Sequence, residues 1–387
     1  MFTRLLENNL PTTSFFLFGP RQVGKSTLLK TVHADLTIDL LNPELQLTYN
    51  KNPNLLLQQA KALAPSSTII VDEVQKVPRL LDVIHARIEQ DPSTRFILCG
   101  SSARKLRHGS SNLLGGRAVY RSMHPLTMKE MGDHFQLPLV LFYGSMPRIY
   151  TLLLENKIDQ AQDLLRAYTV AYLNEEIKAE ALVRNLNGFQ NFIDMAAAQF
   201  AEQINFSSVS RECQVSLSTV REYYSILEDT LIGFFIFPYL KSLRQRMSHS
   251  PKFYFFDNGV TRSILGTLRD NNNPIQQGRL FEQWIIQELT HLNEYHQLDW
   301  KFNFWRTSNG AEVDLLISRG TSILYAIECK STPHIAMRDL TGLKAFHAEH
   351  PDVPCYCVCP VEHPRVVDFV HIVSPQELVS TLHTSSK

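Results

Sequence analysis

A short glycine-containing loop near the start of the chain has the residues needed to hold phosphate. Residues 19–27 read GPRQVGKST and fit G-x-x-x-x-G-K-S/T at every fixed position. The glycines let successive backbone amides turn toward phosphate oxygens, while Lys25 can reach the terminal phosphates and Ser26 can ligate Mg2+ at a helix N-terminus. The pattern predicts a nucleoside triphosphate site made by Gly19, Pro20, Arg21, Gln22, Val23, Gly24, Lys25, Ser26 and Thr27.

Two acidic residues at the end of a predicted strand could complete this site. The run STIIVDE, residues 67–73, ends in Asp72 and Glu73. In a sheet shared with the loop, Asp72 could hold Mg2+ directly or through water, and Glu73 could orient an attacking water as a base. A solvated turn is the less favoured alternative, because a phosphate loop requires such acids. Ser101, after the next strand, could sense the terminal phosphate or only end the strand.

A second group of charged residues lies in the last third of the chain. Asp314 lies in AEVDLLI, and Glu328 and Lys330 lie in AIECK. Residues two apart on a strand face the same side, so Glu328 and Lys330 would point toward Asp314 if these strands pair. The two carboxylates and the Cys329 carbonyl would form a magnesium site, where the Lys330 ammonium could stabilise phosphate charge. Glu282 could add a ligand through water. The alternative is a solvated charge cluster.

The stretch from residue 92 to residue 129 contains no acid and seven positive charges. Three interpretations remain open: a solvated face, a nucleic-acid contact, or an arginine offered to the nucleotide of a neighbouring subunit. For the last of these we favour Arg117, in GGRA. The seven charges are Arg95, Arg104, Lys105, Arg107, Arg117, Arg121 and Lys129.

The elements around the phosphate loop indicate an α/β fold. Apolar strands are predicted from Ser14 to the loop, over residues 67–73 and over residues 95–103, in alternation with helical segments. This alternation predicts a P-loop parallel sheet with helices on both faces, and the near-continuous apolar runs fit strands buried on both sides. We assign residues 1–150 to this domain.

The remainder of the chain is predicted to form two further domains. Residues 151–250 combine a helical segment with two helices that flank a turn near residues 214–216, where Ser216 or Ser218 could be the cap. With the apolar strand LIGFFIFPYL they would make a winged helix-turn-helix. Residues 251–387 should form an α/β domain with a helix at GRLFEQWIIQEL and strands at KFNFWRT, AEVDLLI and LYAIECK.

Composition limits the class of protein and its partners. The 387 residues include 38 Lys and Arg against 38 Asp and Glu, so an anionic partner must be held by a local patch. Six cysteines, three of them in VPCYCVCPV, are too few for a disulfide scaffold. No apolar run approaches the roughly 20 residues of a membrane span, and no secretory signal is evident. We expect a cytoplasmic protein without a membrane partner.

In their order along the chain, these motifs resemble the prokaryotic AAA-like ATPases that carry a C-terminal domain of unknown function. The resemblance rests on the phosphate loop, VDEVQ, GSSA, GGRA, HPLT, FYFFDNG, NGAEVDLLI and AIECKS. It implies a P-loop domain that binds ATP and Mg2+, a helical and winged-helix middle, and a restriction-endonuclease-like end similar to PD-(D/E)XK nucleases. The nuclease motif maps onto Asp314, Glu328 and Lys330, with Glu282. Residues 257–259 read DNG where the family often has DTG.

Two classes of function follow from these interpretations. In the first, Mg2+-dependent ATP hydrolysis drives or gates a metal-dependent phosphodiesterase that acts on DNA or RNA. In the second, ATP switches a protein that holds nucleic acid or a protein partner without cutting. Either class is compatible with a homo-oligomer, because AAA-like relatives often form rings.

Overall fold

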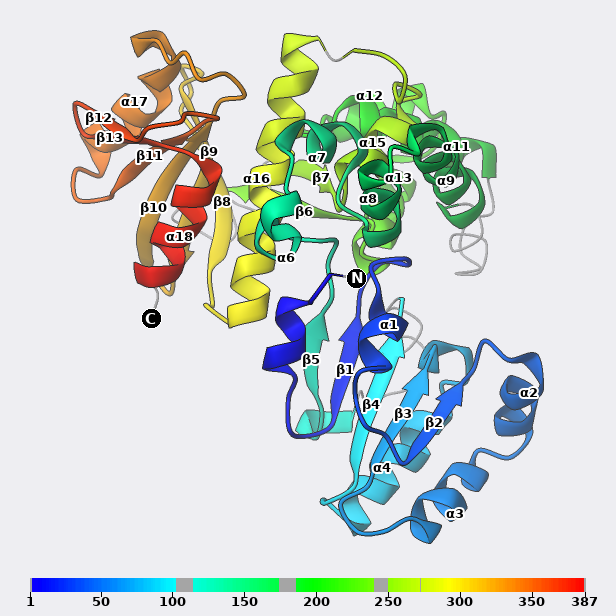
Figure 1. Cartoon of the computed structure of the whole chain (residues 1–387). Helices are drawn as coiled ribbons and strands as arrows, with labels where there is room; N and C mark the ends of the chain where they lie inside the picture. Colours follow the sequence, from blue (N-terminus) through cyan, green and yellow to red (C-terminus); the bar gives the residue numbers. More distant parts are fainter. Residues whose placement is uncertain (1, 102–113, 174–185, 240–249, 272, 386–387) are drawn as a thin grey trace. The chain divides into compact units, whose positions relative to one another are not determined.

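Figure 1 shows the chain as a computed structural model, which describes residues 2–101, 114–173, 186–239, 250–271 and 273–385. The contacts between residues divide the chain into two units. The first comprises Met1–Leu126, Met146–Arg148 and Ile226–Ile232, and the second comprises Thr127–Ser145, Ile149–Ser225 and Gly233–Lys387. The three-domain division at residues 150 and 250 stays a prediction.

A parallel sheet is the framework of the first unit. Its strands are β1 (Phe15–Phe18), β2 (Leu36–Asp39), β3 (Thr68–Asp72), β4 (Arg95–Gly100) and β5 (Val119–Ser122). They lie in the order β2-β3-β4-β1-β5, and every neighbouring pair is parallel. All residues of β1 are buried, as expected for a strand covered on both faces. The predicted α/β fold is confirmed, but the two edge strands, β2 and β5, carry exposed residues and therefore lack the apolar run that revealed the others.

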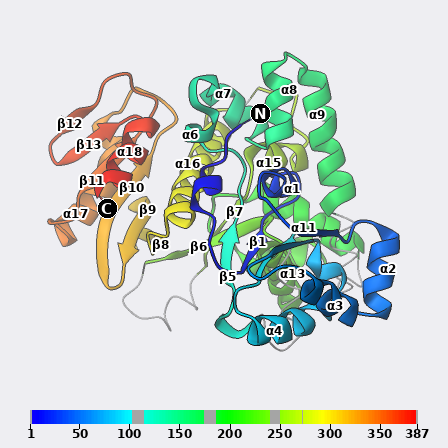
Figure 2. The same cartoon turned by 60° about the horizontal axis from the view of Figure 1, so that its bottom comes forward.

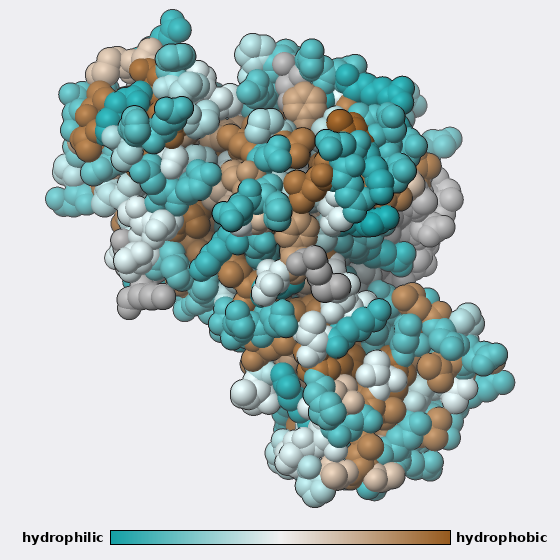
Figure 3. Space-filling view, in the orientation of Figure 1, coloured by the Kyte–Doolittle hydropathy of each residue, from teal (hydrophilic) through white to brown (hydrophobic). Residues whose placement is uncertain are grey.

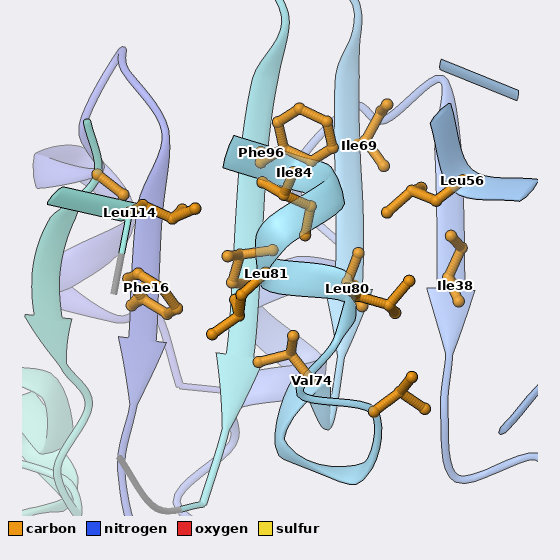
Figure 4. Close-up of a cluster of buried hydrophobic side chains, with 14 of the residues drawn as sticks. Phe16, Ile38, Leu56, Ile69, Val74, Leu80, Leu81, Ile84, Phe96 and Leu114 are labelled. Atoms are coloured by element: carbon orange, nitrogen blue, oxygen red, sulfur yellow. The ribbon is translucent and has the colours of Figure 1, made fainter. Parts of the chain in front are cut away.

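One face of this sheet is covered by α4 (Leu80–Gln90), as Figure 4 shows. Leu80, Leu81 and Ile84 of α4 are fully buried in one cluster with Ile69 of β3 and Phe96 of β4. Their spacing of three and four residues makes a single apolar stripe on the helix, and each buried side chain contributes about 1.5–3 kcal/mol relative to an exposed one. The other helical segments of this part of the chain are η1 (Leu5–Asn9), α1 (Lys25–Leu29), α2 (Pro43–Lys51), α3 (Asn54–Ala62), η2 (Val74–Lys76) and η3 (Leu114–Gly116).

The middle of the chain is helical, as predicted. Two of its helices flank a turn at Gln214, which has a φ of 53°. Ser216 caps the second helix, because its Oγ accepts a hydrogen bond from the Thr219 N–H at 3.1 Å. The described helical segments are α6 (Met128–Met131), η4 (Gly132–His134), α7 (Leu137–Tyr143), α8 (Pro147–Leu154), α9 (Ile158–Ala167), η5 (Tyr168–Leu173), α11 (Leu186–Ala198), α12 (Phe206–Glu212), α13 (Leu217–Asp229) and α15 (Asn258–Ile264).

A mixed sheet of eight strands occupies the second unit, in the order β12-β13-β11-β10-β9-β8-β6-β7 (Figure 2). The strand β6 that follows the two capped helices pairs with β7 antiparallel and with β8 parallel, so it joins the terminal sheet. Helices α16 (Pro274–His296), α17 (Thr341–Glu349) and α18 (Pro375–Ser385) follow, with η6 (Met337–Leu340) before α17. The strands are β6 (Gly233–Pro238), β7 (Lys252–Phe255), β8 (Lys301–Arg306), β9 (Glu312–Arg319), β10 (Ser322–Cys329), β11 (Cys355–Val358), β12 (Arg365–Val367) and β13 (Val370–Val373).

The surface, the helix lengths and the cysteines complete the description of the fold. Hydrophilic residues predominate on the face shown in Figure 3, with hydrophobic residues scattered among them. Within the described residues, no helix is long and apolar enough to cross a membrane. All six cysteines are buried and free, and Cys355 and Cys357 lie on β11, whereas Cys359 follows its end.

Candidate functional site

The backbone of the phosphate loop requires its two fixed glycines. The loop joins β1 to α1, and Gly24 has a φ of 99°, in the left-handed region that glycine adopts without strain. A Cβ at Gly19 would lie 2.2 Å from the carbonyl oxygen of Met123, so that no side chain fits there. The pattern of fixed residues in the motif is thus explained by local geometry as well as by phosphate chemistry.

Lys25 folds back onto the loop. Its Nζ donates hydrogen bonds to the carbonyl oxygens of Gly19 at 2.6 Å and Pro20 at 2.8 Å, and the side chain is buried. This burial lowers the pKa of Lys25. An ammonium held by two neutral carbonyls would gain by exchanging them for phosphate oxygens, because hydrogen bonds between two charged groups are stronger.

Ser26 and Asp72, the predicted magnesium ligands, contact one another. Ser26 Oγ donates a hydrogen bond to Asp72 Oδ2 at 2.8 Å. The other oxygen, Asp72 Oδ1, accepts the backbone N–H of Glu73 at 3.0 Å. A hydroxyl and a carboxylate are the hard oxygen ligands that suit Mg2+. The structure therefore places these two groups where both could hold the same ion.

Glu73 and Ser101 are joined by Gln75, a residue that the sequence patterns did not single out. Gln75 Nε2 donates to Glu73 Oε2 at 2.5 Å and to Ser101 Oγ at 3.1 Å. Its amide oxygen Oε1 is buried and has no hydrogen-bond partner in the described part of the chain. Burial raises the pKa of Glu73, which Lys25 opposes. A carboxylate with a raised pKa is a better proton acceptor, as a base in hydrolysis requires.

Arg4, which lies outside the motif, stabilises the loop through hydrogen bonds. Its Nη1 donates to the carbonyl oxygen of Val23 at 2.6 Å and its Nη2 to that of His124 at 2.6 Å, and Arg4 is only 6% exposed. The planar guanidinium holds both segments in a fixed relation. Sequence spacing gave no signal for this contact, since 19 and 120 residues separate the partners.

The remaining loop residues differ in their exposure. Pro20 and Val23 are buried, Arg21 is half-buried, and Gln22 and Thr27 are exposed. The predicted nucleotide contacts of the exposed residues stay predictions.

Arg117 lies away from the phosphate loop of its own chain. It precedes β5, which runs parallel to β1 with Val119 beside Phe15, whereas the loop follows Phe18 at the other end of β1. Arg117 forms an ion pair with Glu89, and its Nη1 donates to the Gly115 carbonyl oxygen at 3.1 Å. Its role toward a neighbouring subunit stays a prediction. Three of the seven positive charges, Arg104, Lys105 and Arg107, fall outside the described residues.

The second predicted site is assembled by pairing of β9 and β10. The antiparallel register sets Ile327 opposite Leu315, so Glu328 lies beside Asp314. Asp314 Oδ2 accepts the backbone N–H of Cys329 at 2.8 Å, and Lys330 Nζ donates to Glu328 Oε1 at 2.6 Å. Burial and the Asp314 carboxylate raise the pKa of Glu328. The structure therefore brings together the three residues that sequence order predicted to meet.

Three further polar residues surround Glu282 and were missed from sequence. Lys252 Nζ lies 3.0 Å from Glu282 Oε1 and 2.7 Å from Glu312 Oε1. Tyr254 Oη donates to Glu282 Oε1 at 2.5 Å. Burial raises the pKa of Glu282 to about 7. Tyr254 lies in the FYFFDNG segment and Lys252 precedes it, but no sequence pattern indicated their contact with Glu282, because β7 reaches the site through its place in the eight-stranded sheet.

The oxygen atoms of this cluster fit a divalent cation held by few protein ligands. Glu328 Oε2 is buried and has no hydrogen-bond partner among the residues that the structure describes, and a buried carboxylate oxygen of this kind is costly unless a cation or donor reaches it. In the part of the chain that the structure describes, no group of three His, Cys, Asp or Glu side chains converges as a metal site. The protein ligands would therefore be Asp314, Glu328 and the Cys329 carbonyl, a set that suits Mg2+ because this ion keeps several waters.

Comparisons with known proteins match three successive segments of the chain to family models. Residues 12–132 match an AAA domain, and residues 135–271 and 277–378 match two domains of unknown function, DUF8612 and DUF4143. Uncharacterized proteins of Mycobacterium bovis and Mycobacterium tuberculosis are each 26% identical to the chain over 328 residues, 83% of this chain and 71% of theirs. A solved structure of the Aeropyrum pernix ORC2 protein in its ADP form aligns with a TM-score of 0.32 and 13% identity, over 67% of this chain and 90% of that chain. The phosphate loop lies within residues 12–132, the segment that matches the AAA domain.

Proposed function

We propose that the chain binds ATP with Mg2+ and hydrolyses it at the phosphate loop. The observation that carries the proposal is the hydrogen bond from Ser26 to Asp72, with Glu73 as the next residue. Ser26 and Asp72 would hold Mg2+, which neutralises phosphate charge when bound. Lys25 would contact the terminal phosphates, and Glu73 would accept a proton from the attacking water.

A control variant shows whether a loss of turnover is specific to Asp72 or follows from replacing any acid at the end of a strand. We expect Asp72→Asn to lose most Mg2+-dependent phosphate release while the protein stays folded, because the amide keeps an acceptor for the Ser26 hydroxyl. Asp39→Asn is the matched control, since Asp39 ends the neighbouring strand in register with Asp72. Phosphate release should be measured with Mg2+ and with EDTA. Equal Mg2+-dependent turnover in both variants would remove Asp72 from the site.

We also propose that the carboxylate cluster of the second unit is a metal-dependent phosphodiesterase site for nucleic acid. The unpartnered, buried Glu328 Oε2 beside Asp314 supports it. Asp314 and Glu328 would hold Mg2+, which stabilises charge on a phosphate oxygen when bound. Lys330 could then position water or stabilise the developing negative charge.

The competing proposal is a nucleotide-switched module that binds nucleic acid or a protein without cleavage. Plasmid and short RNA, incubated with Mg2+ or Mn2+ and with or without ATP, distinguish the two. The phosphodiesterase proposal is supported if cleavage disappears in Asp314→Asn and persists in Asp352→Asn. Asp352 is an exposed acid outside the cluster. Intact substrates under every condition would favour the switch.

Nucleic-acid binding and self-association belong to the same proposal. Phosphate contacts make the affinity for nucleic acid fall steeply with salt, so a titration from low to high salt measures how many phosphate contacts are formed.

If Arg117 completes the site of a neighbouring subunit, ATP turnover per chain should rise with protein concentration and should lose this dependence in Arg117→Ala. Arg121→Ala, a nearby change on β5, is the control.

A further inference from the structure

Lys252 is a buried cation held between two acids. It is the first residue of β7 and is 4% exposed. Its Nζ lies 3.0 Å from Glu282 Oε1, 2.7 Å from Glu312 Oε1 and 5.5 Å from the ring centre of Phe304. Two ion pairs, with acids on α16 and β9, hold the ammonium in this position.

The hydrogen bonds divide the four carboxylates of the cluster into two pairs. Glu282 and Glu312 share the ammonium of Lys252, and the second oxygen of Glu312 also contacts the half-exposed Arg306 at 3.2 Å. In the other pair, Lys330 Nζ contacts Glu328 Oε1. Among the described residues, the second oxygen of Glu328, Oε2, has no hydrogen-bond partner. Unsatisfied negative charge therefore remains beside Asp314, whereas the Glu282 side is already neutralised.

We propose that the ammonium of Lys252 occupies the position of a second metal ion, so that this cluster binds one divalent cation and not two. In two-metal sites the ions lie about 3.5–4 Å apart and share carboxylate ligands. A fixed ammonium would repel a second ion and occupies acceptor oxygens of both Glu282 and Glu312. The inference rests on the proposed metal site at Asp314 and Glu328, and it makes Lys252 the residue that sets the number of ions.

The number of bound ions tests this inference directly. Mn2+ binding to the full chain is measured by equilibrium dialysis and electron paramagnetic resonance, without nucleotide and in an Asp72→Asn background that disables the first site. The chain with Lys252 should bind one Mn2+ and show no coupling between ions. Lys252→Met should bind two, with the spin-coupled spectrum of a close pair. Lys301→Met removes an exposed lysine from β8 and should leave one ion.

Each result decides between the inference and the site on which it rests. Two coupled ions in the chain that keeps Lys252, or one ion in Lys252→Met, would overturn the role of Lys252 and leave the metal site in place. No bound Mn2+ in the chain that keeps Lys252 would overturn the metal site itself. If Lys252→Met does not fold without metal, Mn2+ should restore its circular dichroism spectrum, and failure of that rescue would also overturn the inference.

Discussion

The two candidate sites are built in different ways. The first lies at the carboxyl ends of parallel strands. Asp72 ends β3 and Glu73 follows it, whereas Ser26 lies on α1, which follows β1 after the phosphate loop. The second draws Lys252, Glu282, Asp314 and Glu328 from β7, α16, β9 and β10. A site made at strand ends depends on backbone geometry within short segments, whereas a site made across strands and a helix depends on sheet order. The two sites should therefore respond differently to single substitutions.

The largest expected effect is at Lys25. Lys25→Ala should weaken ATP binding and lower turnover by about 100-fold or more, because it removes the charged donor to the phosphates. Fluorescent ATP titration and phosphate release measure both quantities. Lys30→Ala, at the exposed end of the same helix, should behave like the wild type. If Lys25→Ala also changes Mn2+ binding at the second site, the two sites are not independent.

A second substitution separates binding from turnover at the first site. Glu73→Gln should keep the ATP dissociation constant within a few-fold while turnover falls by roughly 10²–10⁴, the contribution typical of a base. Glu44→Gln on α2 is an exposed control. Near-normal steady-state ATP hydrolysis in Glu73→Gln would exclude Glu73 as the base.

Glu288 should make the second unit sensitive to pH. It accepts the Met128 N–H at 3.0 and 3.2 Å, and burial raises its pKa from 4.5 to about 8. Because the folded pKa lies above the unfolded one, the stabilising contribution is fully present below about pH 4.5 and is lost as the pH rises toward 8.

Thermal unfolding at several pH values checks this prediction. Glu288→Gln keeps an acceptor for Met128 and should reduce the fall in melting temperature between about pH 4.5 and pH 8, the window set by the unfolded and folded pKa values of Glu288. Glu377→Gln on α18 serves as a control for an acid elsewhere in the unit. An unchanged pH dependence in Glu288→Gln would show that other groups are responsible.

The smallest effect is expected at Gln75. Gln75→Leu removes the donor that joins Glu73 to Ser101, so turnover should fall by about 10-fold, the equivalent of one hydrogen bond to a charged group. The ATP concentration for half-maximal rate should stay the same, because Gln75 positions Glu73 and does not reach the loop. Gln59→Leu on α3 is a matched control. A selective rise in that concentration would place Gln75 in nucleotide binding instead.

Local sequence predicted more of the residues that the structure brings together at the first candidate site than at the second. Residues 19–27, Asp72 and Glu73 lie in short segments whose spacing carries the chemistry, and the parallel sheet that holds them is confirmed. Asp314, Glu328 and Lys330 could be grouped because adjacent strands place them together. Lys252 and Glu312 could not, since their contact requires knowing that β6 and β7 extend the terminal sheet. Arg4 lies outside the quoted motifs, and Gln75 was given no role although it ends the VDEVQ segment, because each acts through side-chain hydrogen bonds that sequence spacing does not reveal.

The position of Arg4 also affects how the protein should be prepared. Because its guanidinium donates hydrogen bonds to the carbonyl oxygens of Val23 and His124, the segment around Arg4 helps to hold the phosphate loop in place. A shortened version that starts after Leu10 would lack this brace, and an affinity tag fused close to Arg4 could displace it. Weak nucleotide affinity in such a preparation would result from the missing arginine and would not test the phosphate loop itself.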